Sequence, residues 1–130
     1  MQGGSRATIM FPEELKRHDN ASLEFAIEQI REIQEDGNHL TALLSYSDLI
    51  QLGGYAAVEY AGGPSMVFRM GRKDAVESEL PQLTHGSDSS SMIEKVANFG
   101  FSRREFVTLM GSHTIGFANM EISGPQGRWT

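Results

Sequence analysis

Signals that begin helices recur along the chain, and they constrain its fold more than any other feature. Ser102-Arg-Arg-Glu105 is a complete capping box, in which the serine and glutamate side chains satisfy each other's backbone N–H groups. Ser45-Tyr-Ser-Asp48 has the same form with an aspartate in the last place, and Asp19 and Asn20 can cap a further helix. We therefore expect helices to begin at these three points.

The spacing of apolar residues and the positions of glycine predict where these helices run. Apolar residues recur at helical spacing at Leu23, Ile27 and Ile30. Gly37-Asn38 is expected to end that helix. Residues 49–60 are apolar nearly all round, which is typical of a helix buried on most sides, and Gly62-Gly63-Pro64 is expected to end it.

The rest of the chain shows little of the alternation that indicates strands. Residues 65–91 are expected to form a long ordered loop, and 92–99 a short helix that ends at Gly100. A short β-like run lies at the N-terminus, up to Phe11. We predict one domain of the all-α class, with no sheet of more than two short strands.

Composition excludes several classes of protein. The net charge of −6 argues against a nucleic-acid surface, and no apolar run approaches the ~20 residues of a membrane span. The sequence contains no cysteine, which excludes disulfide scaffolds, thiolate metal sites and cysteine nucleophiles. The lack of cysteine and of a signal-peptide pattern favours an intracellular protein over a secreted one.

One histidine stands out, because it lies on the apolar face of the last helix. Four residues share that face at helical spacing: Phe106, Leu109, Met110 and His113. From the residues alone, a hydrogen-bonded core histidine is a more common role than a ligand. No zinc-protease pattern, nucleophile elbow, phosphate loop or dinucleotide fingerprint occurs in the chain.

Two longer stretches resemble the class I haem peroxidases, the group of ascorbate peroxidase, cytochrome c peroxidase and catalase-peroxidase. They are LLSYSDLIQLGGYAAVEYAGGPSMVFRMGRKDA at 43–75 and FSRREFVTLMGSHTIG at 101–116. The family's pattern there is a Ser-Tyr-Ala-Asp helix, a Gly-Gly-Pro turn, a Gly-Arg-x-Asp loop and a Gly-Gly-His-Thr-Ile-Gly helix end. The segments GGSRATIMF, LPQLTHGSDSSSMIEKV and ISGPQGRWT also agree, and ascorbate peroxidase is the most similar member.

The resemblance implies a haem-peroxidase-like helical domain. Residues 1–130 are expected to form its middle helices, as a partial haem peroxidase domain. The distal histidine helix is expected before residue 1, and the C-terminal part after residue 130. This chain alone is therefore expected to be a poor peroxidase, and its exposed apolar helix is expected to cause self-association or to require a completing chain.

The resemblance also assigns roles to individual residues. His113 matches the proximal ligand of the haem b iron, and Trp129 matches the tryptophan that stacks beside that histidine. Asn20 matches the asparagine that hydrogen-bonds the distal histidine and raises its basicity. Thr114 and Thr130 match two threonines that help to bind a K⁺ or Ca²⁺ ion in some ascorbate peroxidases.

The sequence departs from the family pattern near the haem propionates. Ile122 stands where ascorbate peroxidases carry an arginine that holds ascorbate. Asn119 replaces a propionate-binding histidine, and Glu79 stands at an arginine position. Three cations or donors are thus neutral or acidic here, which argues against ascorbate as the reductant. Ser112 replaces the second glycine before the histidine, a mild change.

The function that the resemblance implies is haem-dependent reduction of hydrogen peroxide by a small-molecule electron donor, in defence against oxidative stress. The expected location is intracellular, in the cytoplasm, plastid or mitochondrion. The alternative is a non-catalytic, peroxidase-like helical module for binding or structure, which has lost the distal catalytic residues.

Overall fold

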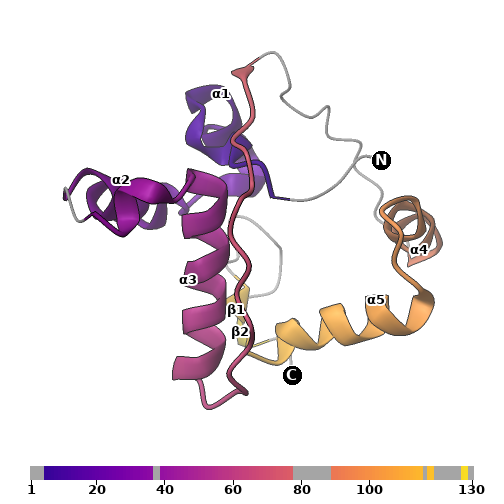
Figure 1. The fold of residues 1–130 in the computed structure, drawn as a ribbon. Helices are drawn as coiled ribbons and strands as arrows, with labels where there is room; N and C mark the ends of the chain where they lie inside the picture. The colour runs from indigo at the N-terminus through magenta and orange to yellow at the C-terminus, as the bar shows by residue number, and fades with distance from the viewer. Residues whose placement is uncertain (1–4, 37–38, 78–88, 116, 119–126, 129–130) are drawn as a thin grey trace. The chain divides into compact units, whose positions relative to one another are not determined.

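The computed structural model describes residues 5–36, 39–77, 89–115, 117–118 and 127–128. The chain divides into two compact units, which are described separately below. The first unit is Gly4–Pro81, and the second combines Met1–Gly3 with Gln82–Thr130. Figure 1 shows the elements of both units in chain order.

The first unit is built from helices and short 3₁₀ turns. Its α-helices are α1 (Pro12–Leu15), α2 (Glu24–Glu35) and α3 (Tyr46–Tyr60). Its 3₁₀ turns are η1 (Thr8–Met10), η2 (His18–Asn20) and η3 (Thr41–Leu43). The expectation of a β-like run before Phe11 is wrong, because Thr8–Met10 forms η1. Helix α1 has proline at its first position, where the missing N–H costs no hydrogen bond.

Helix α2 forms as predicted, but it begins later than expected. Its first residue is Glu24, and Leu23 is its N-cap without any side-chain capping bond. The sequence interpretation of Asn20 as an N-cap is therefore wrong, because Asn20 lies in η2. Ser22 has a left-handed backbone with a φ of 74°, which breaks helical geometry between η2 and α2. Helix α2 ends at Glu35, and Gly37-Asn38 lies outside the described residues.

Helix α3 begins and ends where the sequence predicts. The Ser45 side chain accepts a hydrogen bond from the backbone N–H of Asp48 at 3.1 Å. After Tyr60 the chain turns at Gly62, whose φ is +87°, and Gly63 N donates to the carbonyl of Val58 at 2.9 Å. The turn requires glycine at 63, because an added Cβ would lie 2.6 Å from the side chain of Val58.

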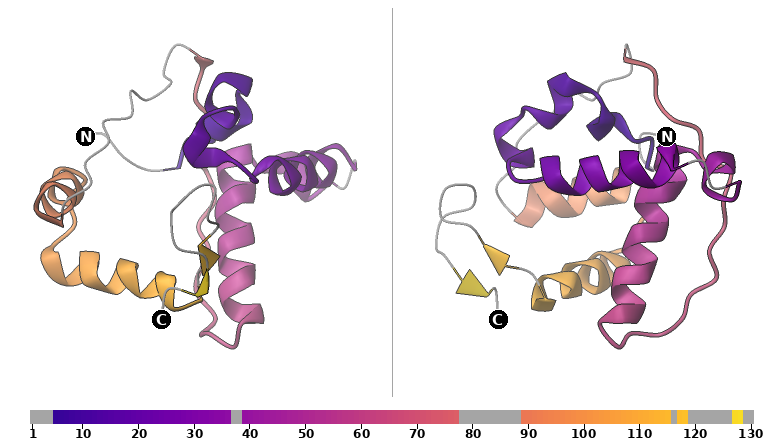
Figure 2. Two further views of the ribbon diagram at one scale, coloured as in Figure 1. Left: turned by 180° about the vertical axis from the view of Figure 1, so that it is seen from behind. Right: turned by 90° about the vertical axis from the view of Figure 1, so that its left-hand side faces the viewer.

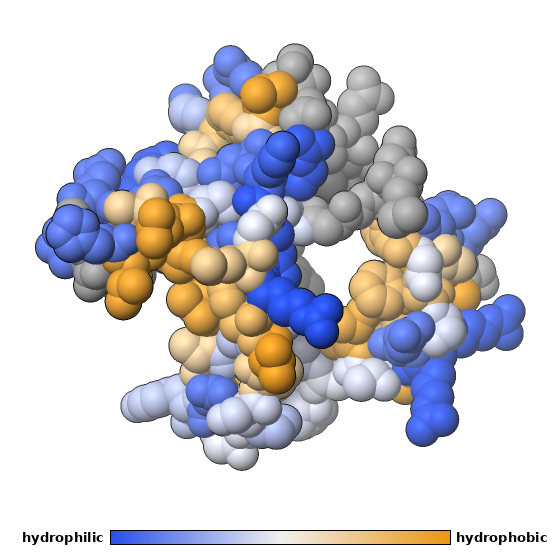
Figure 3. Space-filling model, in the orientation of Figure 1, coloured by the Kyte–Doolittle hydropathy of each residue, from blue (hydrophilic) through white to orange (hydrophobic). Residues whose placement is uncertain are grey.

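The prediction that α3 is buried on most sides is wrong. Only Ser47, Asp48 and Leu49 are buried, and they all lie in the first turn. Farther along, Leu52 is 37% exposed and Tyr60 is 97% exposed. On the face shown in Figure 3, hydrophobic residues gather over α3 and over its junction with α2. An apolar helix thus carries most of its side chains at the surface of the first unit.

The segment 64–76 has no regular secondary structure and runs alongside α3 (Figures 1 and 2). The ring of Phe68 packs edge-on against Tyr55 of α3, with 5.4 Å between the ring centroids. Near its end, Ala75 N donates to the carbonyl of Arg6 at 2.7 Å. The described part of the predicted loop is therefore ordered by contacts with α3 and with the start of the chain. The small core of this unit comprises Ala7, Ile27, Leu49 and Ala75.

The second unit contains two helices and a short strand pair. Helix α4 (Ser89–Asn98) begins three residues earlier than predicted and ends before Gly100, whose φ is +90°. Helix α5 (Arg103–Met110) continues into the 3₁₀ turn η5 (Gly111–Ile115). The strands β1 (Phe117–Ala118) and β2 (Gly127–Arg128) pair antiparallel. The all-α prediction is confirmed, since these two-residue strands are the sole sheet among the described residues.

Candidate functional site

His113 lies in η5, directly after the apolar face of α5. The capping box that starts α5 is complete: Ser102 N donates to the Glu105 carboxylate at 2.8 Å, and Glu105 N donates to Ser102 Oγ at 3.3 Å. The hydroxyl of Ser102 also donates to this carboxylate, at 2.7 Å, and chiefly this bond holds the pKa of Glu105 below its ordinary value. The predicted helix start at Ser102 is confirmed, and it determines where the helical face that leads to His113 begins.

The face predicted for His113 is only partly covered. Phe106, Met110 and His113 are half-buried, whereas Leu109 is 52% exposed. The α-helix ends at Met110, so His113 occupies a tighter 3₁₀ turn and not the last α-turn that the sequence indicated. A half-buried imidazole directly after an apolar helix face fits an iron ligand, because haem iron takes a neutral imidazole held in a fixed orientation. Among the described residues, His113 would therefore be the one to hold a haem iron.

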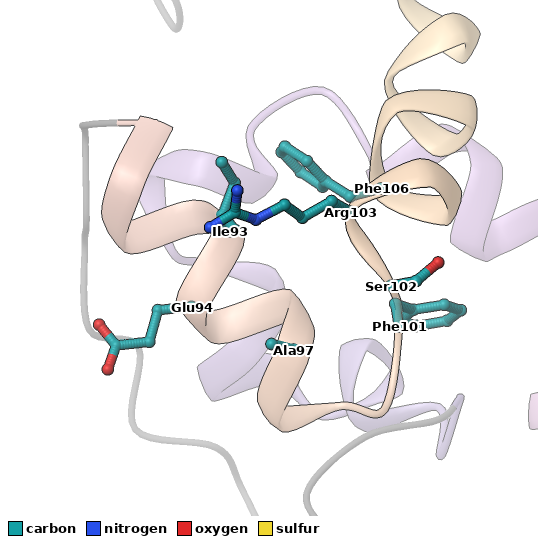
Figure 4. Close-up of a pocket in the computed structure, with 7 residues that line it drawn as sticks. All are labelled: Ile93, Glu94, Ala97, Phe101, Ser102, Arg103 and Phe106. Carbon is teal, nitrogen blue, oxygen red and sulfur yellow. The ribbon is translucent and has the colours of Figure 1, made fainter.

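A groove of about 390 Å³ lies between α4 and α5. Its apolar lining comes from Ile93, Ala97, Phe101 and Phe106. Figure 4 shows the Arg103 side chain extending toward Ile93, whereas Glu94 points away. The groove places Phe106 against α4, and His113 is not among its lining residues. The groove therefore belongs to the packing of α4 against α5.

Asn20 belongs to a polar cluster at the end of α1, in the first unit. Its side-chain Nδ2 donates to the backbone carbonyl of Glu14 at 2.7 Å. The Glu14 side chain, only 7% exposed as a residue, pairs with Arg17 at 3.0 Å. These bonds orient the Asn20 amide and leave its Oδ1 as the acceptor end. The amide is thus held by its backbone partner and does not cap α2.

Two aspartates attach segment 64–76 to the start of α3. The Asp74 carboxylate accepts from Tyr46 N at 3.0 Å, and from Ser47 N and Ser47 Oγ at 2.8 Å each. These bonds satisfy N–H groups of the first helical turn that have no partner within the helix. Because Ser47 is fully buried, its hydroxyl needs a partner of this kind.

Asp48 makes the reverse connection, from α3 to the segment. Its carboxylate accepts from Gly71 N at 2.6 Å, from Arg72 N at 3.3 Å and from Arg72 Nη1 at 2.9 Å. The bond from Gly71 is the main cause that lowers the pKa of Asp48 below its ordinary value, and Arg72 lowers it further. Asp48 therefore does not close the capping box that its sequence position suggested. We call this pair of connections the aspartate clasp, formed by Asp48 and Asp74.

Residues 71–74 lie within the loop that the sequence predicts over 65–91. The structure shows that Asp74 caps α3 from outside the helix and that Arg72 lies over the Phe68 ring, 5.6 Å from its centroid. The sequence signal that could have indicated this role is the Gly-Arg-x-Asp pattern, because no residue near its aspartate in the sequence provides a hydrogen-bonding partner. A partner 27 positions away in the sequence cannot be found from local spacing.

The other predicted site residues are only partly covered by the described structure. Thr114 follows His113 in η5 and is exposed. Trp129 and Thr130 lie outside the described residues, as do the departures at 79, 119 and 122. His113 and Asn20 belong to different units.

The described residues lack two features. They contain no group of three or more histidine, cysteine, aspartate or glutamate side chains arranged to hold a metal ion. Within the same residues, every helix is too short or too polar to cross a membrane.

Comparison with known proteins places these observations in a family. The sequence model of the family described as "Peroxidase" matches residues 1–125. A cytosolic L-ascorbate peroxidase of Oryza sativa subsp. indica is 38% identical, over 98% of this chain and 51% of the relative. A cytosolic one of Arabidopsis thaliana is 39% identical, over 98% and 50%. A peroxisomal one from the same plant is 37% identical, over 98% and 45%. The chain spans about half the length of the curated relatives it matches.

Proposed function

Because this chain belongs to the peroxidase family, we propose that it is a haem-dependent peroxidase that reduces hydrogen peroxide with a small-molecule electron donor. Its role is defence against oxidative stress inside the cell, in line with relatives named as cytosolic or peroxisomal. The observation that carries the proposal is the position of His113, half-buried in η5 directly after the apolar face of α5. That position matches a helix-end motif whose histidine binds haem iron.

The proposal assigns the iron to His113 and haem b as the cofactor. When bound, haem would supply the redox chemistry that reduces peroxide and oxidises the electron donor. The part of this chain is to bind the iron through one imidazole nitrogen and to fix the orientation of the ring. Phe106 and Met110, which precede His113 on the same helical face, are half-buried as His113 is. Trp129 is proposed to stack beside the same imidazole, on the sequence match alone.

Asn20 is proposed, on the sequence match, to hydrogen-bond a distal histidine. Its Nδ2 is engaged by the carbonyl of Glu14, so its Oδ1 can accept a hydrogen bond from an imidazole N–H. Such a bond selects one tautomer and raises the basicity of the other ring nitrogen. A more basic imidazole removes a proton from peroxide more readily.

Thr114 and Thr130 are proposed as ligands of a K⁺ or Ca²⁺ ion. Hydroxyl and carbonyl oxygens suit these hard cations. The exposure of Thr114 leaves its hydroxyl accessible to an ion. Support for this part of the proposal comes from the sequence match at the two threonines.

The reductant is proposed to be a small organic donor, and the residues at 79, 119 and 122 argue against ascorbate. An acidic residue and two neutral ones at the propionate edge would bind an anionic donor poorly. The relatives are named for ascorbate, so the test compares ascorbate with an uncharged phenol. We expect faster turnover with the phenol.

The experiment measures peroxide consumption by the full chain loaded with haem. We expect weak turnover that still exceeds that of the same concentration of haemin without protein, and a fall to the haemin level in His113→Ala. The His39→Ala variant is the matched control, because His39 is an exposed histidine in the first unit. Turnover equal to that of haemin alone in the wild type would contradict the proposal and would fit a non-catalytic helical module instead.

A further inference from the structure

The methionines of the described chain differ sharply in exposure. Met70 is 67% exposed, and Met66 and Met92 are 41% and 39% exposed. Met10 and Met110 are half-buried. Methionine is the side chain that hydroperoxides convert most readily to a stable oxidised form in a protein without cysteine. The order of exposure therefore sets an order of accessibility to peroxide.

Met70 lies between two residues, Phe68 and Gly71, that are anchored to α3. The next residue, Gly71, donates its N–H to Asp48 at 2.6 Å, and Arg72 forms an ion pair with Asp48 at 2.9 Å. Two residues before Met70, Phe68 packs against Tyr55. The segment is thus anchored to α3 on both sides of Met70. Its thioether stays in solvent while the backbone around it is fixed.

We propose that Met70 is a modification site: among the methionines that the structure describes, its thioether is the one that hydrogen peroxide oxidises first. The sulfur lone pair attacks one peroxide oxygen and the O–O bond breaks. The departing oxygen leaves as water after the proton of the attacked oxygen is transferred to it. Sulfur is oxidised by two electrons to the sulfoxide, and peroxide is reduced to water. The inference rests on the proposed function only in taking hydrogen peroxide as the oxidant that the protein meets.

Oxidation at Met70 is expected to leave the fold intact. The sulfoxide adds a polar oxygen to a side chain that already lies mostly in water, so little apolar contact is lost. The aspartate clasp uses the backbone of Gly71 and the side chain of Arg72, and neither bond involves the thioether. Met110 is different, because it shares the half-buried face of His113. Met70 would therefore consume peroxide at a position where the chain tolerates the product.

The experiment treats the full, haem-free chain with hydrogen peroxide and follows sulfoxide at each methionine by mass spectrometry. Cleavage after glutamate gives a peptide 60–77 with Met66 and Met70, and fragmentation separates the two sites. We expect Met70 to be oxidised at least about three-fold faster than Met110 or Met10, with all rates converging in urea. Equal rates for Met70 and Met110 in the folded chain would overturn the proposal.

Substitution gives a second test. With peroxide limiting, Met70→Leu should shift sulfoxide toward the other methionines, whereas Met10→Leu should not. The urea unfolding midpoint of the oxidised wild type should match that of the reduced one, and a clear fall would contradict a tolerated modification. Because no haem is present, the result does not depend on whether the loaded protein is a peroxidase, and the two proposals fail separately.

Discussion

Asp48 is the residue whose charge matters most for the described structure. Its carboxylate is 2% exposed as a residue and accepts hydrogen bonds from two backbone N–H groups and one guanidinium. These donors favour the ionised form, which is why its pKa is lowered. A carboxyl group with a lowered pKa in the folded state stabilises the fold above its ordinary pKa, and this contribution is lost as pH falls through the folded-state pKa.

We predict that Asp48→Asn lowers the urea unfolding midpoint at neutral pH. The amide has no negative charge for Arg72, and it presents an NH₂ group where Gly71 and Arg72 both donate. The difference from wild type should shrink as pH falls below 3.8, the ordinary pKa of the side chain, because the wild type then loses the same charge. Circular dichroism during urea titration at several pH values measures this.

The control is Glu59→Gln, which removes one charge from the exposed end of the same helix. That variant should have the wild-type midpoint at every pH. A constant difference between Asp48→Asn and wild type down to the most acidic pH would show that the Asp48 charge is not what stabilises the clasp.

At the scale of single elements, the local sequence correctly predicted the helix starts and ends that are determined by residues a few positions apart. The capping box at Ser102 and the glycines after Tyr60 act within a few positions, and both are confirmed. The start of α2 was misplaced, because Asn20 is engaged by Glu14 through a bond that the capping pattern does not encode. The predicted burial of α3 was also wrong. Apolar composition indicates that a surface could be covered by other parts of a protein, but it does not show that the surface is covered.

For the candidate site too, the sequence predicted the local features and missed those that depend on distant residues. The motif identified His113, and the periodicity of α5 placed it with Phe106 and Met110, all half-buried in the structure. The change to a 3₁₀ turn after Met110 was not visible in the spacing, because three- and four-residue repeats are similar over so few positions. The aspartate clasp joins residues more than 20 positions apart, so only the folded chain reveals it.

A helix-level prediction concerns the start of α5. Ser102→Ala removes the acceptor for Glu105 N and the hydroxyl bond to the Glu105 carboxylate. Loss of an N-cap serine costs about 1 kcal/mol of helix stability. We expect a lower unfolding midpoint and faster amide hydrogen exchange in α5. Ser112→Ala, at an exposed serine of η5, is the matched control, and an equal effect there would contradict a specific role for the cap.

For the whole molecule, exposed apolar side chains predict self-association. Leu40, the N-cap of η3, and Leu43, its last residue, are 73% and 76% exposed, and α3 adds Leu52 and Tyr60. Contiguous exposed apolar area promotes association of soluble proteins. We predict concentration-dependent oligomers in analytical ultracentrifugation, and a shift toward monomer in the double variant Leu40→Ser, Leu43→Ser. Ala42→Ser, at an exposed site between them, serves as control. A wild type that stays monomeric at high concentration would rule this out.

The central claim, that this member of the peroxidase family binds haem iron through His113, is tested most directly by haemin titration. Absorption spectroscopy follows the Soret band of haemin as the full chain is added, for wild type, His113→Ala and His39→Ala. Because loss of a supporting contact around a metal ligand already weakens binding about 10- to 100-fold, loss of the ligand itself should cost at least about 10-fold. We predict saturable binding with a shifted Soret band in wild type and His39→Ala, and a weakened, altered spectrum in His113→Ala. An unchanged spectrum and affinity in His113→Ala would contradict the assignment.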